Sequence, residues 1–430
     1  MMRAFCNVPD QHAMTVPDSP ERQFATDTVK RLREAGYEAL WAGGCVRDEL
    51  LGKTPKDYDV ATTATPEQVI ELFGQRKTVA VGASFGVVMV LGPNRRSGQI
   101  EVATFRADGE YLDGRRPSSV VYCSAEEDAR RRDFTINGMF FDPVEDVVID
   151  YVGGRQDLRV GIIRAIGDAR QRFEEDKLRI LRAVRFAATY EFELDPQTAT
   201  AVCELAPQLS VVSAERIAQE LRRMLSHPTR GTSVRWMREL GLMSEIPGCA
   251  DDWNAASPLL PNCLPQLKLP RFEAALACLM VPSLDWAGVP TKGLSARCRK
   301  LKLSNDESGA IAWLVASMPE AVCAAELPLH RLKRLLVDAR AELLIDLVQA
   351  TQHSAAADFL AAYLHNHTPE QLNPEPLLTG QDLKQLGHQP GPAFKRVLTT
   401  VRNEQLDEKI DTPAAALELA DRLLSQSEDR

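Results

Sequence analysis

The uneven distribution of strand-like and helix-like segments restricts the fold of this chain more than any other feature. Apolar runs typical of β-strands occur up to about residue 165 and nearly disappear after it. Helical spacing of apolar residues dominates from about Asp128 onward. The sequence therefore predicts an α+β fold, with a sheet-containing head over residues 19–165 and a long helical remainder.

Local signals place several elements of the head. Ser19 followed by Pro20 is typical of a helix start, and Gly36 is expected to end that helix. The segment "YEALWAGG" predicts a strand that ends at the glycine pair, and "DYDVAT" predicts a second strand that begins at Asp57. A further helix is predicted for residues 66–73. The segments "FGVVMVL" and "QIEVATFR", separated by "GPNRRSG", predict a β-hairpin.

Length and composition restrict the class of protein. A chain of 430 residues is too long for one simple core and is expected to form two to four packed units. No apolar run approaches the roughly 18–20 residues of a membrane span, so no membrane partner is expected. Residues 1–18 contain no apolar core of signal-peptide type and are expected to be a flexible tail, with Met14 as an alternative start.

Cysteine use and net charge bear on the compartment and the partners. The nine cysteines are scattered without a CxxC pair or a zinc-ligand spacing, which favours a reducing, cytoplasmic location. The net charge of −9 argues against indiscriminate coating of nucleic acid. A local basic surface for nucleic acid remains compatible with that charge, and nothing indicates an obligatory protein partner.

Asp57 and Asp59 are the first candidate catalytic pair. Residues i and i+2 of a strand point to the same side, so both carboxylates are expected to project together while Tyr58 faces the other way. Two adjacent carboxylates repel each other, and a divalent cation such as Mg²⁺ removes that cost. A DxD pattern alone is also common in polar loops, so the pair needs support from its neighbours.

Three neighbouring features favour a metal and phosphate site. Gly43 and Gly44 precede a helix start, where free backbone N–H groups can face an anion. Arg47, one turn into that helix, adds positive charge. Glu101 is predicted on another strand of the same sheet and supplies a third carboxylate. Two metals held by three carboxylates can clamp the attacking and leaving oxygens of a phosphoryl displacement.

An ordered set of motifs gives a specific resemblance. The segment "GGCVRDELLGKTPKDYDVAT" resembles the signature of the class II tRNA nucleotidyltransferase and bacterial poly(A) polymerase superfamily, a branch of the polymerase-β-like nucleotidyltransferases. "DGRRPSSV" resembles the flexible loop of that family, "RRDFTING" its ribose-selecting motif, "EEDKLRILRAVRF" its base-selecting helix and "VSAERIAQEL" the neck helix that follows. The resemblance covers roughly residues 36–225.

The resemblance implies an architecture and an activity. It implies a polymerase-β-like head with a small mixed sheet, then an elongated helical neck over residues 166–225 and a helical body and tail over 226–430 that bind tRNA. Asp57 and Asp59 would hold Mg²⁺ as cofactor, and Glu101 would position or deprotonate the 3′-OH of the primer. The flexible loop would comprise Asp113, Gly114, Arg115, Arg116 and Pro117.

Base choice is assigned by the resemblance to Asp176 and Arg179. They lie three residues apart on a predicted helix that begins near Asp168, away from the apolar stripe of that helix. A carboxylate accepts from the exocyclic amine shared by cytosine and adenine, and a guanidinium donates to their ring acceptors. A surface ion pair would give the same spacing.

Further nucleotide-binding residues follow from the other motifs. Arg132 and Asp133 are expected to begin a helix, with Arg132 at the triphosphate and Asp133 at the ribose 2′-OH. Asn137 matches the asparagine of that motif, and Arg182 belongs to the base-selecting segment. Gly138 departs from the alanine expected there, a change expected to affect packing only. The alternative to a nucleotide-binding role for the three arginines at residues 130–132 is a basic surface patch exposed to solvent.

The helical remainder contains candidate RNA-binding segments. Residues 222–240 and 296–304 are locally basic, which suits phosphate contacts but also suits ordinary solvated helix faces. Residues 379–398 resemble a C-terminal segment of bacterial CCA-adding enzymes. The favoured function is addition of CCA to tRNA 3′ ends from CTP and ATP. The alternatives are addition of CC or A alone, poly(A) synthesis, and a catalytically silent RNA-binding protein.

Overall fold

The computed structural model of the chain describes residues 17–82, 86–108, 120–249, 260–281, 286, 291–385 and 391–428. Packing divides the chain into two compact units. Unit 1 comprises residues 1–224 and 232–246, and unit 2 comprises residues 225–231 and 247–430. The flexible loop predicted for residues 113–117 lies outside the described residues.

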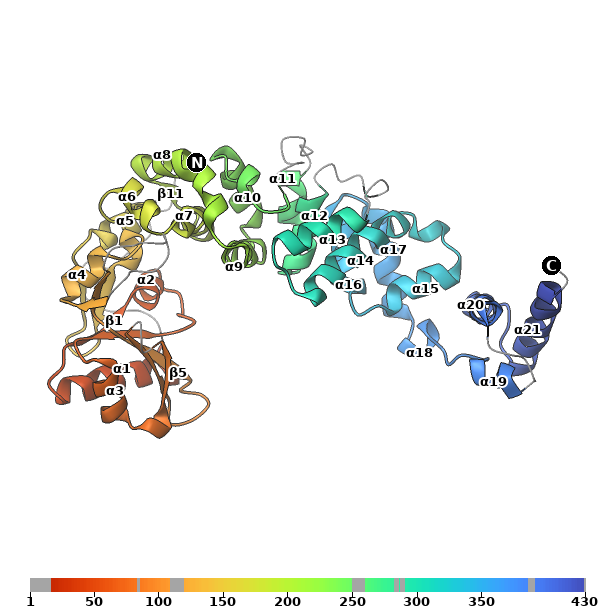
Figure 1. Cartoon of the computed structure of the whole chain (residues 1–430), viewed down its shortest axis with the longest axis horizontal. Coiled ribbons are helices and arrows are strands. Elements are labelled where there is room, and N and C mark those ends of the chain that lie inside the picture. The colour runs from red at the N-terminus through yellow and green to blue at the C-terminus, as the bar shows by residue number, and fades with distance from the viewer. Residues whose placement is uncertain are drawn as a thin grey trace. The chain divides into compact units, whose positions relative to one another are not determined.

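A seven-stranded mixed sheet lies in the N-terminal part of unit 1 (Figure 1). Its strands, in spatial order, are β3 (Thr78–Gly82), β4 (Val87–Leu91), β5 (Gln99–Thr104), β2 (Asp59–Thr62), β1 (Ala39–Ala42), β8 (Met139–Asp142) and β9 (Val147–Asp150). Neighbouring strands are antiparallel except for β2 and β5, which are parallel. This parallel pair brings residues 42 positions apart in sequence side by side, as the register Asp59↔Glu101 shows.

Short strands and helices complete unit 1. The short strands are β6 (Arg106–Asp108), β7 (Val120–Tyr122), β10 (Ile162–Ile163) and β11 (Glu193–Leu194). The helices are α1 (Pro20–Glu34), α2 (Gly44–Leu50), α3 (Pro66–Phe73), η1 (Gln75–Lys77), α4 (Ala125–Arg130), η3 (Thr135–Asn137), α5 (Gly154–Val160), α6 (Ala169–Glu175), α7 (Leu178–Tyr190), α8 (Pro196–Leu205), η4 (Ala206–Val211), α9 (Ala214–Leu225), α10 (Arg230–Glu239) and η5 (Met243–Glu245).

The two faces of the sheet are covered by different helices. Helices α1 and α3 pack on one face, where the guanidinium of Arg22 lies 5.0 Å from the ring centre of Trp41. The other face packs against α4 through a cluster that includes Leu40, Ala61 and Phe140. Because side chains alternate along a strand, Asp59 projects to the same face as Ala61, the face covered by α4.

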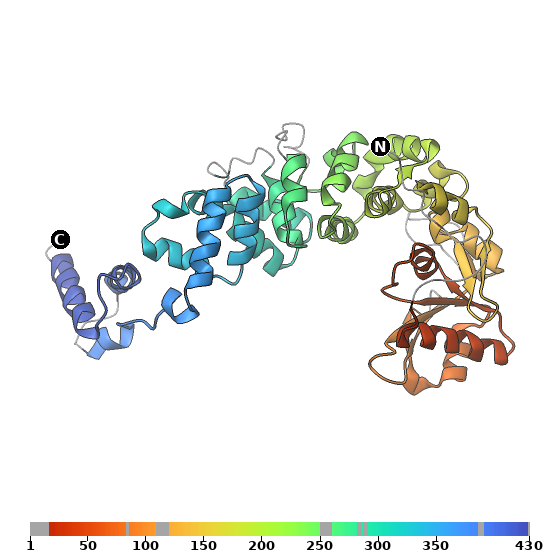
Figure 2. The ribbon, with the colours of Figure 1, turned by 180° about the vertical axis from the view of Figure 1, so that it is seen from behind.

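The described part of unit 2 is helical, as the view from behind shows (Figure 2). Its helices are α11 (Leu260–Cys263), η7 (Leu264–Gln266), α12 (Phe272–Met280), α13 (Thr291–Lys300), α14 (Asn305–Ala321), η8 (Ala324–Glu326), α15 (Leu329–Val337), α16 (Ala341–Ala350), α17 (Ser354–Asn366), α18 (Pro369–Leu372), α19 (Gly380–Gln385), α20 (Pro392–Leu406) and α21 (Pro413–Glu428). Helices α19 to α21 share a small apolar core of their own.

Several predicted elements are confirmed. Helix α1 begins after Ser19, whose hydroxyl accepts from the backbone N–H of Arg22 at 3.1 Å. Helix α3 spans the predicted residues 66–73, and β4 and β5 form the predicted hairpin. The α+β class with a small mixed sheet and a helical remainder is likewise confirmed.

Three local predictions are wrong. Strand β2 begins at Asp59, so Asp57 lies in a bend before the strand. The helix predicted from Asp168 is broken at Asp176, which ends α6 with an extended backbone before α7 begins. Arg132 and Asp133 do not begin a helix: they follow the end of α4 and precede the single turn η3. Each error concerns a boundary within a polar segment, where apolar periodicity gives no signal.

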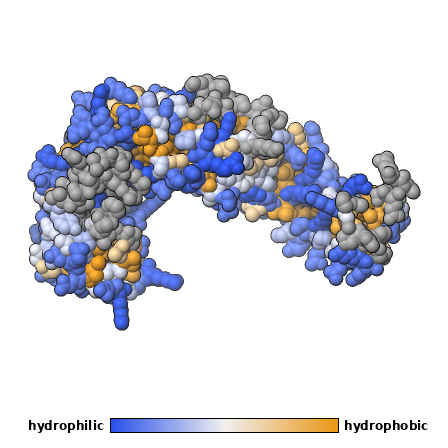
Figure 3. Space-filling view, in the orientation of Figure 1, coloured by the Kyte–Doolittle hydropathy of each residue, from blue (hydrophilic) through white to orange (hydrophobic). Residues whose placement is uncertain are grey.

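The surface visible in Figure 3 is mostly hydrophilic, with apolar residues gathered in small patches. Among the described residues, no helix is both long enough and apolar enough to cross a membrane.

Candidate functional site

Two carboxylates meet at the centre of the sheet. Asp59 of β2 and Glu101 of β5 are direct partners across the parallel ladder, so their side chains project to the same face. Burial and the charge of Glu101 raise the pKa of Asp59 to about 6, with a further increase from Asp57 and an opposing effect of Arg132. The fold thus holds negative charges close together at a cost that a bound cation would relieve.

Asp57 lies near this site, but in a bend and not in the strand predicted for it. It lies outside the strand, so alternation does not orient its side chain, yet its charge acts on Asp59. Tyr58 points into the core as expected, because its hydroxyl donates to Glu49 at 2.6 Å and its ring lies 5.0 Å from that of Trp41. The buried tyrosine anchors the bend that carries Asp57.

The carboxylates of Asp57, Asp59 and Glu101 suit a metal ion that takes its remaining ligands from a substrate. Within the described ranges, no three side chains from His, Cys, Asp and Glu form a group that could hold a metal by themselves. Mg²⁺ usually takes one or two protein carboxylates and completes its octahedron with water and substrate phosphates. The mutual repulsion of Asp57, Asp59 and Glu101 is the property that such a cation would neutralise.

The glycine pair has a steric role that the sequence did not indicate. The N–H of Gly43 donates to the carbonyl of Met139 at 3.1 Å, so this donor is used within the protein. A Cβ built on Gly43 would lie 2.7 Å from Nη1 of Arg132, and its φ of +73° favours glycine. Gly44 tolerates a Cβ, which would lie 3.6 Å from Arg47. Gly43 therefore makes room for the guanidinium of Arg132.

Arg132 lies between the glycine turn and the carboxylates. Its Nε and Nη2 donate to Asp128 at 3.1 and 2.9 Å, and its guanidinium lies 5.0 Å from the ring centre of Phe140. Its charge lowers the pKa of Asp59. A positive group next to the carboxylate cluster is suitably placed for an anionic substrate group bound there.

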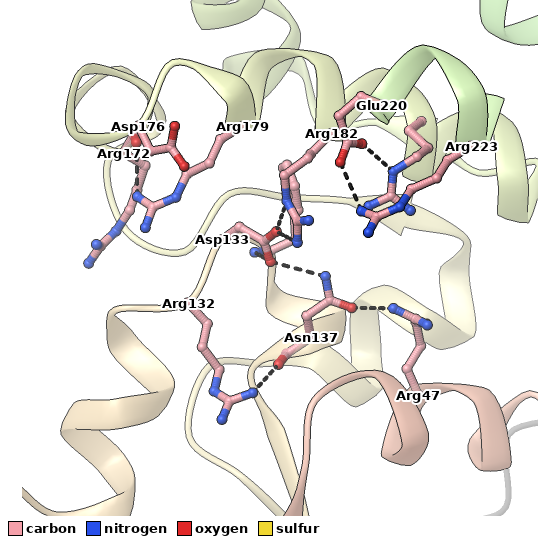
Figure 4. Close-up of polar contacts among 12 residues, drawn as sticks. Arg47, Arg132, Asp133, Asn137, Arg172, Asp176, Arg179, Arg182, Glu220 and Arg223 are labelled. Carbon is pink, nitrogen blue, oxygen red and sulfur yellow. Dashed lines mark hydrogen bonds and ion pairs between the residues drawn. The ribbon is translucent and has the colours of Figure 1, made fainter. Parts of the chain in front are cut away.

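Four predicted residues form one hydrogen-bonded chain (Figure 4). Arg47 of α2 donates to Oδ1 of Asn137 at 2.5 Å. The amide of Asn137 donates to Asp133 at 3.0 Å, and Nε of Arg182 in α7 donates to the other oxygen of Asp133 at 2.7 Å. The chain links the helix after the glycine pair to the base-selecting segment.

Asp133 is ionised within this chain. Burial would raise its pKa, but Arg182 and Asn137 lower it to about 2. The carboxylate also accepts from the backbone N–H of Phe134 at 2.8 Å. The arrangement therefore presents Asp133 as a fixed hydrogen-bond acceptor at neutral pH.

The side chains of Asp176 and Arg179 are each held by other residues. Both oxygens of Asp176 accept from Arg216 of α9, at 3.1 and 2.8 Å. Arg179 donates to Glu175 at 2.7 Å and to the carbonyl of Arg172 at 2.9 Å. The prediction that a common helix face holds this pair is wrong, because the chain breaks between them (Figure 4).

Arg216 and Glu175 are the residues that the sequence reasoning missed. Arg216 lies in "VSAERIAQEL", which was noted only as a neck helix, and its partner lies 40 residues earlier. Glu175 precedes Asp176 directly, and its position four residues before Arg179 was the available signal. Both hold a base-selecting candidate in place.

The basic segments of the helical part divide into buried and exposed residues. Arg230 is buried and donates to the carbonyls of His227 and Leu269. Arg297 donates to the carbonyl of Met280 at 2.9 Å. The exposed basic residues in these segments include Arg235, Arg238, Arg299, Lys300 and Lys302.

Comparisons with known proteins identify the family to which the chain is similar. The chain matches the family described as "Poly A polymerase head domain" over residues 39–164 and the family described as "Probable RNA and SrmB- binding site of polymerase A" over residues 191–252. It is 38% identical to the CCA-adding enzyme of Geobacillus stearothermophilus over 302 residues, 70% of this chain and 72% of that protein.

Two further similarities extend the comparison. The chain is 41% identical to poly(A) polymerase I of Salmonella typhi over 249 residues, 55% of this chain and 52% of that protein. The crystal structure of the CCA-adding enzyme of Bacillus stearothermophilus in complex with CTP superposes with a TM-score of 0.80 at 27% identity, covering 96% of this chain and all of that one.

Proposed function

Because this chain belongs to the family of CCA-adding enzymes and bacterial poly(A) polymerases, we propose that it adds CCA, or part of it, to tRNA 3′ ends. CMP and AMP would be transferred from CTP and ATP without a nucleic acid template, with release of pyrophosphate. The observation that carries the proposal is the pairing of Asp59 with Glu101 beside Asp57 and Arg132.

The chain's own residues account for the transfer step. Glu101 accepts a hydrogen bond from the primer 3′-OH and orients that oxygen toward the α-phosphate. Arg132 neutralises charge on the triphosphate. Mg²⁺ held by Asp57 and Asp59 would supply further positive charge where the phosphoryl group is transferred. Positioning of the reactants and electrostatic stabilisation can account for the catalysis, because phosphoryl transfer needs little covalent chemistry from a protein.

Recognition of the nucleotide follows from the hydrogen-bonded chain. Asp133, kept ionised by Arg182, accepts from the ribose 2′-OH. Arg47 and Asn137 hold Asp133 in that position. The glycine turn at Gly43 and Gly44 brings backbone and Arg132 close to the phosphates.

Base choice is assigned to Asp176 and Arg179. Cytosine and adenine offer an amine donor next to a ring acceptor, whereas uracil and guanine offer a keto group and a ring N–H. Arg216 and Glu175 limit the rotation of the two reading side chains, so a mismatched base cannot easily recruit them. A good bidentate contact favours the correct base by about 1–3 kcal/mol.

Poly(A) synthesis is the second candidate. It is supported by 41% identity to poly(A) polymerase I of Salmonella typhi, but the chain spans only 52% of that protein, against 72% of the CCA-adding relative. A catalytically silent RNA-binding protein is disfavoured, because clustered carboxylates repel RNA phosphates. Addition of CC or A alone would use the same residues.

The cellular setting belongs to the same proposal. The nine scattered cysteines, without a CxxC pair or a zinc-ligand spacing, favour a reducing compartment such as the cytoplasm. The partners proposed are tRNA, CTP and ATP. Exposed basic residues of the helical part would contact the phosphates of the acceptor arm.

Three tRNA substrates test the proposal. Purified protein is incubated with tRNAs that end before CCA, after C and after CC, each with CTP or ATP alone and with both. We expect C on the first two and A on the third, with termination after A. Long A-tails on any substrate would establish poly(A) synthesis instead.

A matched variant connects the activity to the site. Asp57→Ala should abolish incorporation while tRNA binding, measured by filter retention, is unchanged. Incorporation at the wild-type rate would refute the metal assignment. If the wild-type protein and the Asp57→Ala variant both bind tRNA but neither incorporates nucleotides, the result would support the alternative of a catalytically silent RNA-binding protein.

A further inference from the structure

A second pocket in unit 1 is not accounted for by the proposed reaction. Its volume is about 420 Å³, within the range of about 300–1,000 Å³ typical of small-molecule sites. It lies among the residues that follow β9 and β10, the start of α6 and the start of α8. None of its described lining residues belongs to the proposed nucleotide site.

The lining of this pocket is rich in guanidinium groups. Arg130, Arg164 and Arg172 line it, against a single carboxylate, Asp195. Arg164 pairs with Asp157 at 3.0 Å and with Asp195 at 2.5 Å, yet 43% of its side chain is exposed. Arg130 pairs with Glu126 at 2.7 Å, and 62% of its side chain is exposed. Planar guanidinium groups with solvent access are the side chains best suited to bind phosphate.

An aromatic ring and amide groups accompany these arginines. Tyr151 lines the pocket with 40% of its surface exposed, and its ring meets that of Phe140 edge-on at 6.5 Å. Gln197, at the start of α8, also lines the pocket. An exposed aromatic face accepts a nucleobase by stacking, and an amide can hydrogen-bond its edge. The lining therefore combines groups for a phosphate with groups for a base.

Arg172 connects this pocket to the base-selecting residues. Its Nη1 donates to Glu175 at 2.7 Å, and the same carboxylate oxygen accepts from Arg179 at 2.7 Å. Its backbone carbonyl also accepts from Arg179. Its other donors bond the carbonyls of Ile166 and Arg130, at 3.1 and 2.6 Å. A phosphate that attracts Arg172 would therefore weaken its hold on Glu175 and alter the freedom of Arg179.

We propose that this pocket is a second binding site for a phosphorylated nucleoside, either a free nucleotide or one residue of the RNA. Its occupancy is transmitted to Arg179 through Arg172 and Glu175. The binding site is independent of the reaction proposed above, whereas its effect on base choice rests on that proposed function.

Binding stoichiometry tests the site. Equilibrium dialysis of the full-length protein with radiolabelled CTP should give two sites per chain. The double variant Arg130→Glu/Gln197→Glu places negative charge in the pocket and should weaken one site about tenfold or more, because hydrogen bonds to charged groups are strong. Arg170→Glu, on α6 with 58% of its side chain exposed and outside the lining, should retain both sites.

The outcomes separate the sources of the ligand. If tRNA lacking CCA displaces one of two CTP equivalents, and the double variant abolishes that displacement, the pocket takes an RNA residue. If both equivalents remain in the presence of tRNA, the pocket takes the free nucleotide. A single CTP site in the wild-type protein, or two unaltered sites in the double variant, would overturn the proposal.

Base choice tests the connection through Arg172. With tRNA as the primer, the double variant should incorporate CMP and AMP with a wild-type kcat. The ratio of incorporated CMP to incorporated AMP at fixed nucleotide concentrations should differ from that of the wild-type protein. An unaltered ratio, in a variant that has lost the second site, would refute the connection. Because CTP stoichiometry is measured without turnover, failure of the proposed reaction would not affect the binding result.

Discussion

Asp133 shows at the scale of single residues how the candidate site is held in one ionisation state. Its carboxylate is buried, and Arg182 and Asn137 occupy its two oxygens. Burial alone would raise its pKa, but these partners lower it to about 2, from an ordinary value of 3.8. A folded-state pKa below the unfolded one stabilises the folded state above the unfolded pKa, and this contribution decreases as the pH falls toward the folded value.

Arg182→Met should therefore destabilise the protein in a pH-dependent manner. One pKa unit corresponds to about 1.4 kcal/mol, so we expect a loss of about 2–3 kcal/mol at pH 7. The loss should be smaller at pH 3, where the stabilising ionisation is already partly suppressed. Urea unfolding at both pH values measures it, with Arg170→Met on the exposed surface as the control. Equal losses at pH 7 and pH 3 would contradict the assignment.

Arg216 provides a second prediction for a single residue. Arg216→Ala removes the two hydrogen bonds from this guanidinium to the Asp176 carboxylate, which keeps its hydrogen bond from the backbone N–H of Leu178 but can rotate more easily. We expect the preference for CTP over UTP to fall about tenfold, corresponding to about 1.4 kcal/mol of discrimination, with a smaller change in kcat. Arg223→Ala, on the same helix and paired with Glu220, is the control. If the Arg216→Ala variant keeps the wild-type preference for CTP over UTP, Asp176 does not need Arg216 in order to select the base.

Among the elements of the site, the turn after η3 leaves no space for a side chain at Gly138 unless its neighbours shift. A Cβ there would lie 2.7 Å from Cγ2 of Val152 and 3.0 Å from Cδ1 of Ile166. The alanine expected at this position therefore does not fit the neighbours present in this chain. Because η3 carries Asn137, its packing positions part of the candidate site.

Gly138→Ala should destabilise the protein by about 1–3 kcal/mol, as overpacking of a tight interior does. Adding Val152→Ala removes the closest contact and should restore part of the loss, which a double-mutant cycle by urea unfolding would measure. Gly309→Ala, in α14 with open space around its Cβ, should be neutral or stabilising. Additive effects of Gly138→Ala and Val152→Ala would contradict the steric explanation.

At the scale of the whole molecule, contacts with a large RNA depend on exposed charge distributed over the helical part. Arg299 and Lys300 are exposed at the end of α13, whereas Arg230 and Arg297 are engaged with backbone carbonyls. Of these four residues, the exposed pair is the one suited to RNA phosphates. The division of residues 226–430 into a tRNA-binding body and tail remains a prediction.

Arg299→Glu/Lys300→Glu should weaken tRNA binding and leave CTP binding unchanged. Removing two phosphate contacts should reduce the slope of log affinity against log salt by about two. Filter binding between 50 and 200 mM salt, roughly the range over which such slopes are resolved, provides the measurement. Arg76→Glu/Lys77→Glu, an exposed basic pair on η1, is the control. An unchanged affinity and slope would assign the α13 pair to an ordinary solvated helix face.

The sequence by itself determined the fold class, the head elements near the site and the motif residues. Strand alternation, helix caps and the hairpin turn are local properties, so Ser19, the β4–β5 hairpin and α3 were predictable from short segments. The ordered motifs also named Asp133, Asn137, Arg47 and Arg182, which the fold joins in one chain of hydrogen bonds.

Only the tertiary structure decided how those residues are held. Gly43 makes room for Arg132 across the turn, and Arg216 holds Asp176 from a helix 40 residues later in the chain. The break between α6 and α7 separates Asp176 from the helix face on which periodicity placed it. Such contacts join residues distant in sequence, and apolar periodicity contains no information about which polar partners meet across a packed interface.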